Sequence, residues 1–307
     1  MLKEAYRPRK ITFLWVRGEH PPNFDSPLVF LVLGIRGAGK SAFLEVIADH
    51  YLARGHNVID LFGARSGEGL AWLRSPYRDE KILLIKSSHV DVSCSWTTKN
   101  WESITLRDLE NNRIVISSSP LYSRIDEEFV AVNHILDVLF SRLGWHKYIF
   151  LLVRESANLF YSRMKLRDTQ HLAKAEAAYL IRESRHHGIA IGMDTQKLTA
   201  VDADLRNLTD YIIFKSQGYY NLPKDLWFIY RYLDPIWFRN MHPREFAVLS
   251  RTGAIGIGYF EYPYWHKEAK ENLLKLLDIR VEKSEEAAEL NEELIDIEEG
   301  RPIHPHI

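Results

Sequence analysis

Cysteine is scarce in this 307-residue chain, and the single Cys94 excludes an internal disulfide and any zinc site built on paired cysteines. Long apolar runs are also lacking. The longest, residues 28–33 and 148–153, fall far short of the roughly 20 residues that a membrane-spanning helix needs, so no span is expected. No apolar signal core follows the charged residues 1–10. We therefore expect a cytoplasmic protein.

The net charge of −1 conceals an uneven distribution along the chain. Residues 282–307 hold nine acidic and two basic side chains, a local net charge of −7, which leaves +6 for residues 1–281. A mildly basic body with an acidic tail is compatible with a polyanionic partner. An ordinary solvated surface explains the same distribution, so charge alone selects no function.

Short apolar runs alternate with amphipathic stretches of helical length from residue 28 onward. Such runs are typical of strands buried in a parallel sheet. The expected strands are residues 28–34, 57–63, 81–88, 113–119, 147–153, 189–194 and 210–215, and the expected helices are residues 40–54, 126–143 and 157–187. This alternation predicts an α/β fold with a mainly parallel sheet that helices cover on both faces.

The chain divides into three regions by composition. Residues 1–27 are expected to form an N-terminal arm that lends one strand, KITFLWV, to the sheet. Residues 28–281 are expected to form the main domain, in which residues 216–266 comprise a helical aromatic segment and a closing β-hairpin. Residues 282–307 form an acidic C-terminal tail.

One glycine-rich motif carries specific chemistry. GIRGAGKS matches GxxxxGK[ST], follows a predicted strand and opens a predicted helix, which is the context of a P-loop. Its residues are Gly34, Ile35, Arg36, Gly37, Ala38, Gly39, Lys40 and Ser41. The glycines let successive backbone N–H groups turn toward phosphate oxygens, and the helix N-terminus adds partial positive charge. We expect ATP as cofactor, with Lys40 at the β and γ phosphates and the Ser41 hydroxyl as a Mg²⁺ ligand; the alternative is a glycine-rich turn without a ligand.

Two polar residues follow later predicted strands. Glu155 comes just beyond KYIFLLV, where a carboxylate can activate a water that faces the γ-phosphate. Gln196 follows IAIGMDT, where an amide can hold that water or sense the γ-phosphate. An acid in the first turn of a helix and an ordinary polar strand end are the alternative interpretations.

The order of these motifs resembles the FtsK/HerA superfamily of DNA-pumping ATPases. A P-loop, an apolar strand followed by an acid, a helix with an arginine shortly before Gly-Ile, and a strand that ends in Thr-Gln occur in this order within residues 28–266. The resemblance implies a RecA-like, additional-strand catalytic glutamate fold, a homo-oligomeric ring that is usually hexameric, and ATP-driven movement of double-stranded DNA. It also implies these residue roles: Walker A for Lys40 and Ser41, catalytic glutamate for Glu155, polar sensor for Gln196, and trans-acting arginine for Arg185, with Arg182 and Arg163 as alternatives.

The sequence departs from the family directly before Glu155. The family's strand normally ends Asp-Glu, whereas this chain has Arg154-Glu155, so the acid that helps to hold Mg²⁺ through water is missing there. Ser41 as the direct ligand, with Asp60 or Asp91 contributing from neighbouring strands, is one solution. Slow hydrolysis is the other.

Three functions stay open. The first is a ring motor that translocates double-stranded DNA in chromosome or plasmid processing, conjugation or viral genome packaging. The second is an ATPase for phage assembly or protein export, which works with a membrane-bound or capsid partner. The third is an ATP-binding structural or regulatory subunit with weak hydrolysis, which Arg154 motivates. Lys165, Arg167 and Lys174 are candidate contacts to DNA phosphates, and an ordinary solvated helix face is the alternative.

Overall fold

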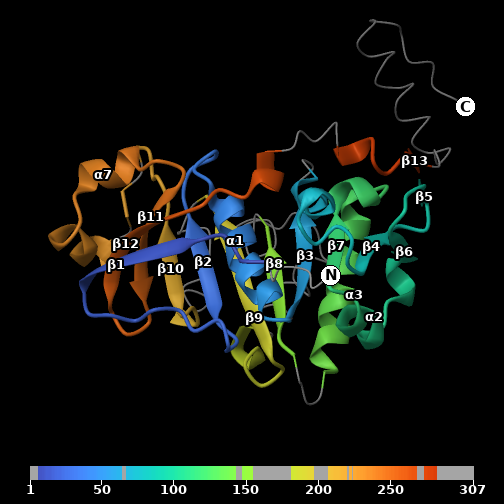
Figure 1. The fold of residues 1–307 in the computed structure, drawn as a ribbon, viewed down its shortest axis with the longest axis horizontal. Helices are drawn as coiled ribbons and strands as arrows, with labels where there is room; N and C mark the ends of the chain where they lie inside the picture. Colours follow the sequence, from blue (N-terminus) through green and yellow to red (C-terminus); the bar gives the residue numbers. More distant parts are fainter. Residues whose placement is uncertain are drawn as a thin grey trace, which may run out of the picture.

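The fold is known from a computed structural model, which describes residues 6–63, 67–142, 147–154, 181–196, 207–219, 221–222, 224–267 and 273–281 (Figure 1). Its described strands form one large sheet in the order β1-β12-β11-β10-β2-β9-β8-β3-β7-β4-β6 and a small sheet of β13 and β5. The strand bounds are β1 Ile11–Arg17, β2 Val29–Leu33, β3 Asn57–Gly63, β4 Ile82–Lys86, β5 Val90–Val92, β6 Thr97–Asn100, β7 Ile114–Ser118, β8 Ile149–Val153, β9 Ile189–Thr195, β10 Tyr211–Phe214, β11 Glu245–Ser250, β12 Ile255–Phe260 and β13 Ile279–Val281.

Most of the large sheet is parallel. Every neighbouring pair from β10 across to β6 is parallel, whereas β1, β12 and β11 continue the sheet beyond β10 in antiparallel pairs. The central strands β2, β8 and β9 are buried along their whole length. They read as continuous apolar runs because both faces of the sheet are covered.

Helices cover the two faces of the sheet. The α-helices are α1 Lys40–Ala53, α2 Leu106–Asn111, α3 Ile125–Phe140 and α7 Pro235–Asn240, and the short 3₁₀ helices are η1 Glu68–Arg74, η2 Trp101–Ser103, η3 Ser119–Leu121, η5 Lys224–Arg231 and η6 Tyr264–Lys267. One apolar core joins the sheet to α1, η1 and η6, and a second core joins it to α2, α3, η5 and α7. The predicted α/β class, with a mainly parallel sheet covered on both faces, is confirmed.

The expected elements are found where the structure describes the chain. All seven expected strands are present, as are the helices predicted at 40–54 and 126–143. The strand of the N-terminal arm is β1, which pairs with β12, and the closing hairpin is β11 and β12. The helix predicted at 157–187 falls mostly on residues 155–180, which lie outside the described part. The sequence analysis missed β5, β6 and α2, which are short and lack a continuous apolar run.

In the part of the chain that the structure describes, no helix combines the length and apolar character that crossing a membrane requires.

Candidate nucleotide-binding site

The glycine-rich loop connects β2 to α1 at the carboxyl edge of the parallel strands. Gly37 and Gly39 have φ angles of 77° and 83°, a region that side chains with a Cβ rarely adopt. Gly39 is the N-cap of α1, so the 14-residue helix begins directly at the loop with Lys40. Lys40 is buried, and its Nζ donates a hydrogen bond to the Ile35 carbonyl 3.1 Å away. The loop therefore places backbone N–H groups, an ammonium group and a helix N-terminus together, as phosphate binding requires.

Neighbouring strands hold the start of the loop in place. The Gly34 N–H donates to the Thr195 carbonyl at the end of β9, and the Ile35 N–H donates to the Ser216 carbonyl just after β10. A Cβ on Gly34 would lie 2.7 Å from the Lys215 side chain, so only glycine fits at this close approach. The loop is thus attached to the strands on both sides of β2.

The buried Lys215 side chain packs against Gly34 at the start of the glycine-rich loop, a role that the sequence analysis missed. Its Nζ donates to the Pro243 carbonyl at 2.8 Å and to the Glu245 carbonyl, and it lies 4.6 Å from the centre of the Phe260 ring. Burial lowers the pKa of Lys215 to about 7. The Pro243 carbonyl in turn packs against Gly39, where an added Cβ would approach it to 2.5 Å. The segment before β11 therefore braces the point at which α1 begins.

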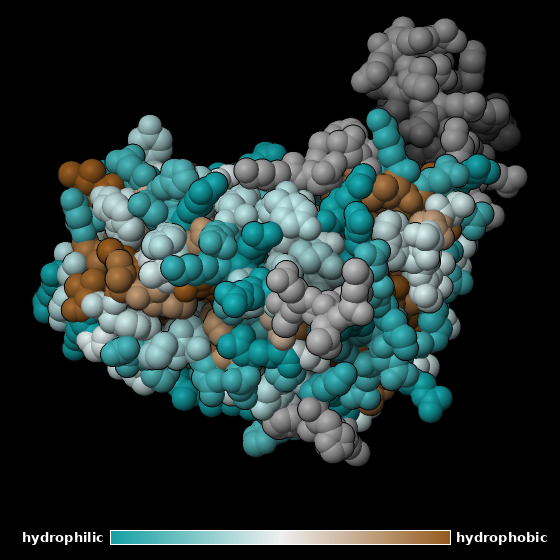
Figure 2. Space-filling view, viewed as in Figure 1, coloured by the Kyte–Doolittle hydropathy of each residue, from teal (hydrophilic) through white to brown (hydrophobic). Residues whose placement is uncertain are grey.

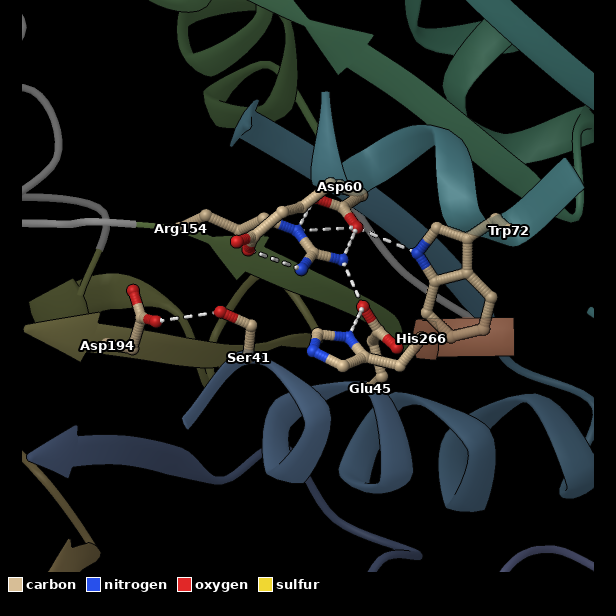
Figure 3. A network of polar contacts seen from close by, with 8 residues as sticks. Ser41, Glu45, Asp60, Trp72, Arg154, Asp194 and His266 are labelled. Carbon is tan, nitrogen blue, oxygen red and sulfur yellow. Dashed lines mark hydrogen bonds and ion pairs between the residues drawn. The ribbon is translucent and has the colours of Figure 1, made fainter. Parts of the chain in front are cut away.

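Ser41 and Asp194 meet where β9 passes the start of α1. The Ser41 hydroxyl donates a hydrogen bond to Oδ2 of Asp194 at 3.3 Å, and the Asp194 side chain is buried (Figure 3). The contact arises because β9 pairs with β2 in parallel, with Asp194 opposite Val32. Asp194 was not among the predicted site residues. It does end a predicted strand, but its closeness to the loop depends on strand order, which the sequence does not state.

Gln196 and Arg185 lie near opposite ends of the central strands. Gln196 directly follows β9, whose last residue, Thr195, is in register with Leu33 before the loop, and the Gln196 side chain is exposed. Arg185, about half exposed, forms an ion pair with Asp210, which also accepts a hydrogen bond from the Val29 N–H at the start of β2. Gln196 is therefore beside the loop of its own chain, whereas Arg185 lies near the start of β2, at the other end of that strand from the loop.

Arg154 lies at the centre of a buried network of charged groups (Figure 3). Its guanidinium donates to both carboxylate oxygens of Asp60, at 2.6 to 3.1 Å, and to Glu45 at 2.9 Å. The exposed fraction of Arg154 is 1%, and Asp60 and Glu45 are fully buried. The network also includes Trp72, which donates to Asp60 at 2.7 Å, His266, which lies 3.1 Å from Glu45, and the half-exposed Glu68, which lies 3.4 Å from Arg154.

The network shifts the titration of its members. Burial alone would raise the pKa of Glu45, but His266 and Arg154 together hold that pKa below its usual value. Burial alone would lower the pKa of His266, but Glu45 raises it. Arg154 stays charged, because Asp60 and Glu45 raise its pKa well above the ordinary value despite its burial. Asp60 and Glu45 therefore both accept hydrogen bonds from Arg154, and each has a further partner, Trp72 for Asp60 and His266 for Glu45.

The sequence suggested that Asp60 or Asp91 helps to hold Mg²⁺, and the structure gives both residues other surroundings. Both oxygens of Asp60 accept hydrogen bonds from Arg154, and Trp72 donates to one of them. Asp91 belongs to β5 in the small sheet, where it is opposite Arg280. The acid that the structure brings to Ser41 is Asp194. Glu155, the expected catalytic glutamate, lies outside the described residues, as do Arg163, Lys165, Arg167 and Lys174.

The strand order identifies the architecture. The P-loop strand β2 lies between β10 and β9, and β9 separates it from β8, the strand that precedes Arg154 and Glu155. An additional strand therefore lies between the two strands that carry the P-loop and the expected glutamate. The fold is similar to that of the pCW3 conjugation coupling protein TcpA in its monomer form with ATPγS, whose structure matches 89% of this chain and 71% of TcpA with a TM-score of 0.50 and 13% identity.

The fold is that of a RecA-like P-loop ATPase. Two further similar structures are the genome packaging NTPase B204 from Sulfolobus turreted icosahedral virus 2 with ATPγS, and the cytoplasmic domain of the Thermomonospora curvata type VII secretion ATPase EccC. B204 has 14% identity and a TM-score of 0.42 over 75% of this chain and 96% of B204. EccC has 12% identity and a TM-score of 0.45 over 82% of this chain and 26% of EccC. No protein-family model matches the sequence, and no curated protein matches it.

Proposed function

We propose that this chain is an ATP-hydrolysing motor that assembles into a ring, hexameric as its sequence resemblance implies, and translocates double-stranded DNA. The observation that carries the proposal is the loop at residues 34–41, held by β9 and β10 and continued by α1, in a sheet with an additional strand beside β2. Such a loop binds the phosphates of a nucleotide through backbone N–H groups and the helix N-terminus.

The residues of the site divide the chemical work. The Lys40 ammonium neutralises charge on the β and γ phosphates, and the exposed Gln196 at the end of β9 holds or senses the attacking water. Glu155 orients and activates that water as general base. The Ser41 hydroxyl is a hard oxygen donor of the kind that Mg²⁺ takes together with nucleotide phosphates, and the Asp194 carboxylate beside it adds negative charge, so the residues present fit this ion. Bound Mg²⁺ supplies positive charge that stabilises the transferring phosphoryl group.

The surface supports assembly into a ring. On the face in Figure 2, apolar side chains gather at the end of the molecule that holds β1 and α7. The large apolar side chains exposed on these elements, on the neighbouring η5 and β12, and directly after η5 are Leu14, Val16, Trp227, Tyr232, Ile236 and Tyr259. Exposed apolar side chains concentrated in one region are typical of protein–protein contacts. We propose that this end contacts the next subunit, and that Arg185 acts in a neighbouring site, with Arg182 and Arg163 as alternatives.

The DNA substrate is supported by the charge and by the motif order. Residues 1–281 carry +6, which favours a polyanion, and Lys165, Arg167 and Lys174 are the candidate phosphate contacts. TcpA, whose fold this chain shares, is a conjugation coupling protein. An export or phage-assembly ATPase with a membrane-bound or capsid partner is the alternative in the same enzyme class.

A second candidate function follows from Arg154. Its guanidinium occupies the position at which the family has the acid that helps to hold Mg²⁺, and it draws Asp60 and Glu45 to itself. A subunit that binds ATP to hold its shape and hydrolyses it slowly would tolerate this exchange. The ATPase rate separates the two functions.

The decisive experiment measures ATP hydrolysis by the full chain with and without duplex DNA, over several DNA lengths and salt concentrations. A DNA motor is stimulated by duplex DNA, and the stimulation weakens as salt rises. The Lys40→Ala variant is the control and should lose about 100-fold or more in turnover, because a charge-stabilising donor is removed. Hydrolysis without DNA stimulation under all conditions would contradict the DNA substrate. ATP binding without measurable hydrolysis would favour the regulatory subunit. A strictly monomeric species in the presence of ATPγS would contradict the ring.

A further inference from the structure

The position directly after β8 presents a problem for metal binding. An acid at this position would accept hydrogen bonds from water on Mg²⁺, whereas Arg154 has five N–H donors and no acceptor. A cation at this position also repels a second cation. Arg154 is nevertheless buried at 1% exposure, and its charge is compensated by Asp60 and Glu45. A carboxylate that helps to hold the metal is therefore to be sought among the acids that Arg154 does not engage.

Asp194 meets that requirement on the adjacent strand. It lies on β9, one strand nearer to the P-loop than β8, and its Oδ2 accepts the hydrogen bond of the Ser41 hydroxyl at 3.3 Å. A serine hydroxyl has one proton to donate and lone pairs that can bind a metal at the same time. Asp194 is thus placed to orient the Ser41 oxygen, and its burial at 1% exposure keeps the carboxylate in a fixed position.

Neighbouring acids have other partners. Asp60 accepts from Arg154 and Trp72, and Glu45, one turn after Ser41 on α1, accepts from Arg154 and lies against His266. Figure 3 separates the two groups: Ser41 and Asp194 form one pair, and Arg154 lies between Asp60 and Glu45. Asp60 and Glu45 thus contact the buried guanidinium of Arg154, whereas Asp194 contacts the hydroxyl of Ser41.

We propose that Asp194 is the positioning carboxylate of the Mg²⁺ site: it orients the Ser41 hydroxyl as a metal ligand and accepts a hydrogen bond from metal-bound water, in place of the acid that Arg154 replaces. On this proposal the acid that helps to hold the metal lies near the end of β9, and not directly after β8 as in the family. This inference rests on the proposed ATP-binding function and adds a residue to it. Outer carboxylates of this kind typically change metal affinity by about 10- to 100-fold when they are removed.

The test separates metal binding from nucleotide binding. ATPγS affinity is measured first without divalent metal, in EDTA, and Mn²⁺ is then titrated into the ATPγS complex and followed by electron paramagnetic resonance, since oxygen ligands that suit Mg²⁺ also suit Mn²⁺. Asp194→Asn keeps the shape of the side chain and removes its charge. Asp49→Asn is the matched control, because Asp49 is a buried carboxylate on the same helix as Ser41 whose partners are Tyr77, Tyr6 and the Arg9 N–H.

We expect Asp194→Asn to bind ATPγS in EDTA as the unchanged protein does, and to bind Mn²⁺ about 10- to 100-fold more weakly in the ATPγS complex. Asp49→Asn should match the unchanged protein in both measurements. Equal Mn²⁺ affinity for Asp194→Asn and the unchanged protein would overturn the assignment while leaving ATP binding intact. Failure of the unchanged protein to bind ATPγS would overturn the proposed function itself. If Asp194→Asn does not fold, as judged by circular dichroism, Asp194→Glu takes its place: weakened Mn²⁺ binding supports the assignment, and unaltered Mn²⁺ binding overturns it.

Discussion

Replacing Arg154 by methionine tests how much the buried charge network contributes to stability. Methionine keeps much of the side-chain length and removes the guanidinium. In the native protein Arg154 donates to Asp60 and Glu45, both fully buried, and ion-pairs more weakly with the half-exposed Glu68. The substitution therefore leaves two buried carboxylates without their main counter-charge.

The expected magnitude follows from this geometry. Removing one partner of a buried ion pair typically costs about 3 to 5 kcal/mol, because the remaining charge is buried without compensation. Glu45 keeps His266 and Asp60 keeps Trp72, so we expect a loss within this range at neutral pH and not above it. An unpaired buried carboxylate has a raised pKa and binds a proton more readily. The loss should therefore shrink as the pH falls from 7 toward 5.

Urea unfolding followed by circular dichroism measures this loss. With a slope of about 3 kcal/mol per M of urea for a large domain, the midpoint should fall by about 1 to 1.7 M. Adding Asp60→Asn to Arg154→Met should recover part of the stability, since one uncompensated charge is then absent and the amide oxygen can still accept from Trp72.

Two results would refute the reasoning. A midpoint change below about 0.3 M for Arg154→Met would mean that the guanidinium contributes under about 1 kcal/mol, as an exposed ion pair does. Strictly additive effects in the double variant would mean that Arg154 and Asp60 do not act as a pair.

Three further predictions concern the loop, the expected base and the pH dependence. Gly39→Ala should destabilise the protein more than Gly37→Ala, because both positions have positive φ but a Cβ at Gly39 would also lie 2.5 Å from a backbone carbonyl oxygen, whereas a Cβ at Gly37 meets nothing within 4 Å; equal urea midpoints would contradict this. Glu155→Gln should retain ATPγS affinity and lose turnover by about 100-fold or more, and unchanged turnover in a steady-state assay would remove Glu155 from its role. Because the pKa of His266 is raised, its contribution to stability is full below about pH 6.5 and is lost as the pH rises through the raised pKa. Because the pKa of Glu45 is lowered, its contribution is lost as the pH falls below about 4.5. His266→Asn should therefore flatten the alkaline side of a urea-midpoint profile between pH 5 and 9, and a slope equal to that of the unchanged protein would refute the pairing.

The loop and its strand were predictable because their signals are local. Gly34 to Ser41 specify a phosphate loop by composition and spacing, and the flanking runs specify a strand and a helix without reference to the rest of the chain. The same holds for β1 and for the β11–β12 hairpin, because the apolar pattern that predicts each strand lies within a few consecutive residues. The departure at Arg154 was also visible, since it occupies one position in a known order of motifs.

What Arg154 does was not predictable, because its partners are far along the chain. Asp60, Glu45 and Glu68 lie 94, 109 and 86 residues away from it. The closeness of Ser41 to Asp194 spans 153 residues in the same way. Pairing between distant residues depends on which strands lie side by side, and the sequence specifies the strands without their order.

By itself, then, the sequence determined a glycine-rich loop with the P-loop pattern between a buried strand and a helix, and an α/β fold in which that loop is placed at the edge of a parallel sheet. The tertiary structure decided which partner each of these buried acids contacts. It inserted β9 between β2 and β8, which brought Asp194 to Ser41, and it enclosed Asp60 and Glu45 around Arg154. The physical reason is that a charge buried in a low-dielectric core must find its counter-charge in space, and only the packing of the strands determines which residue is within reach.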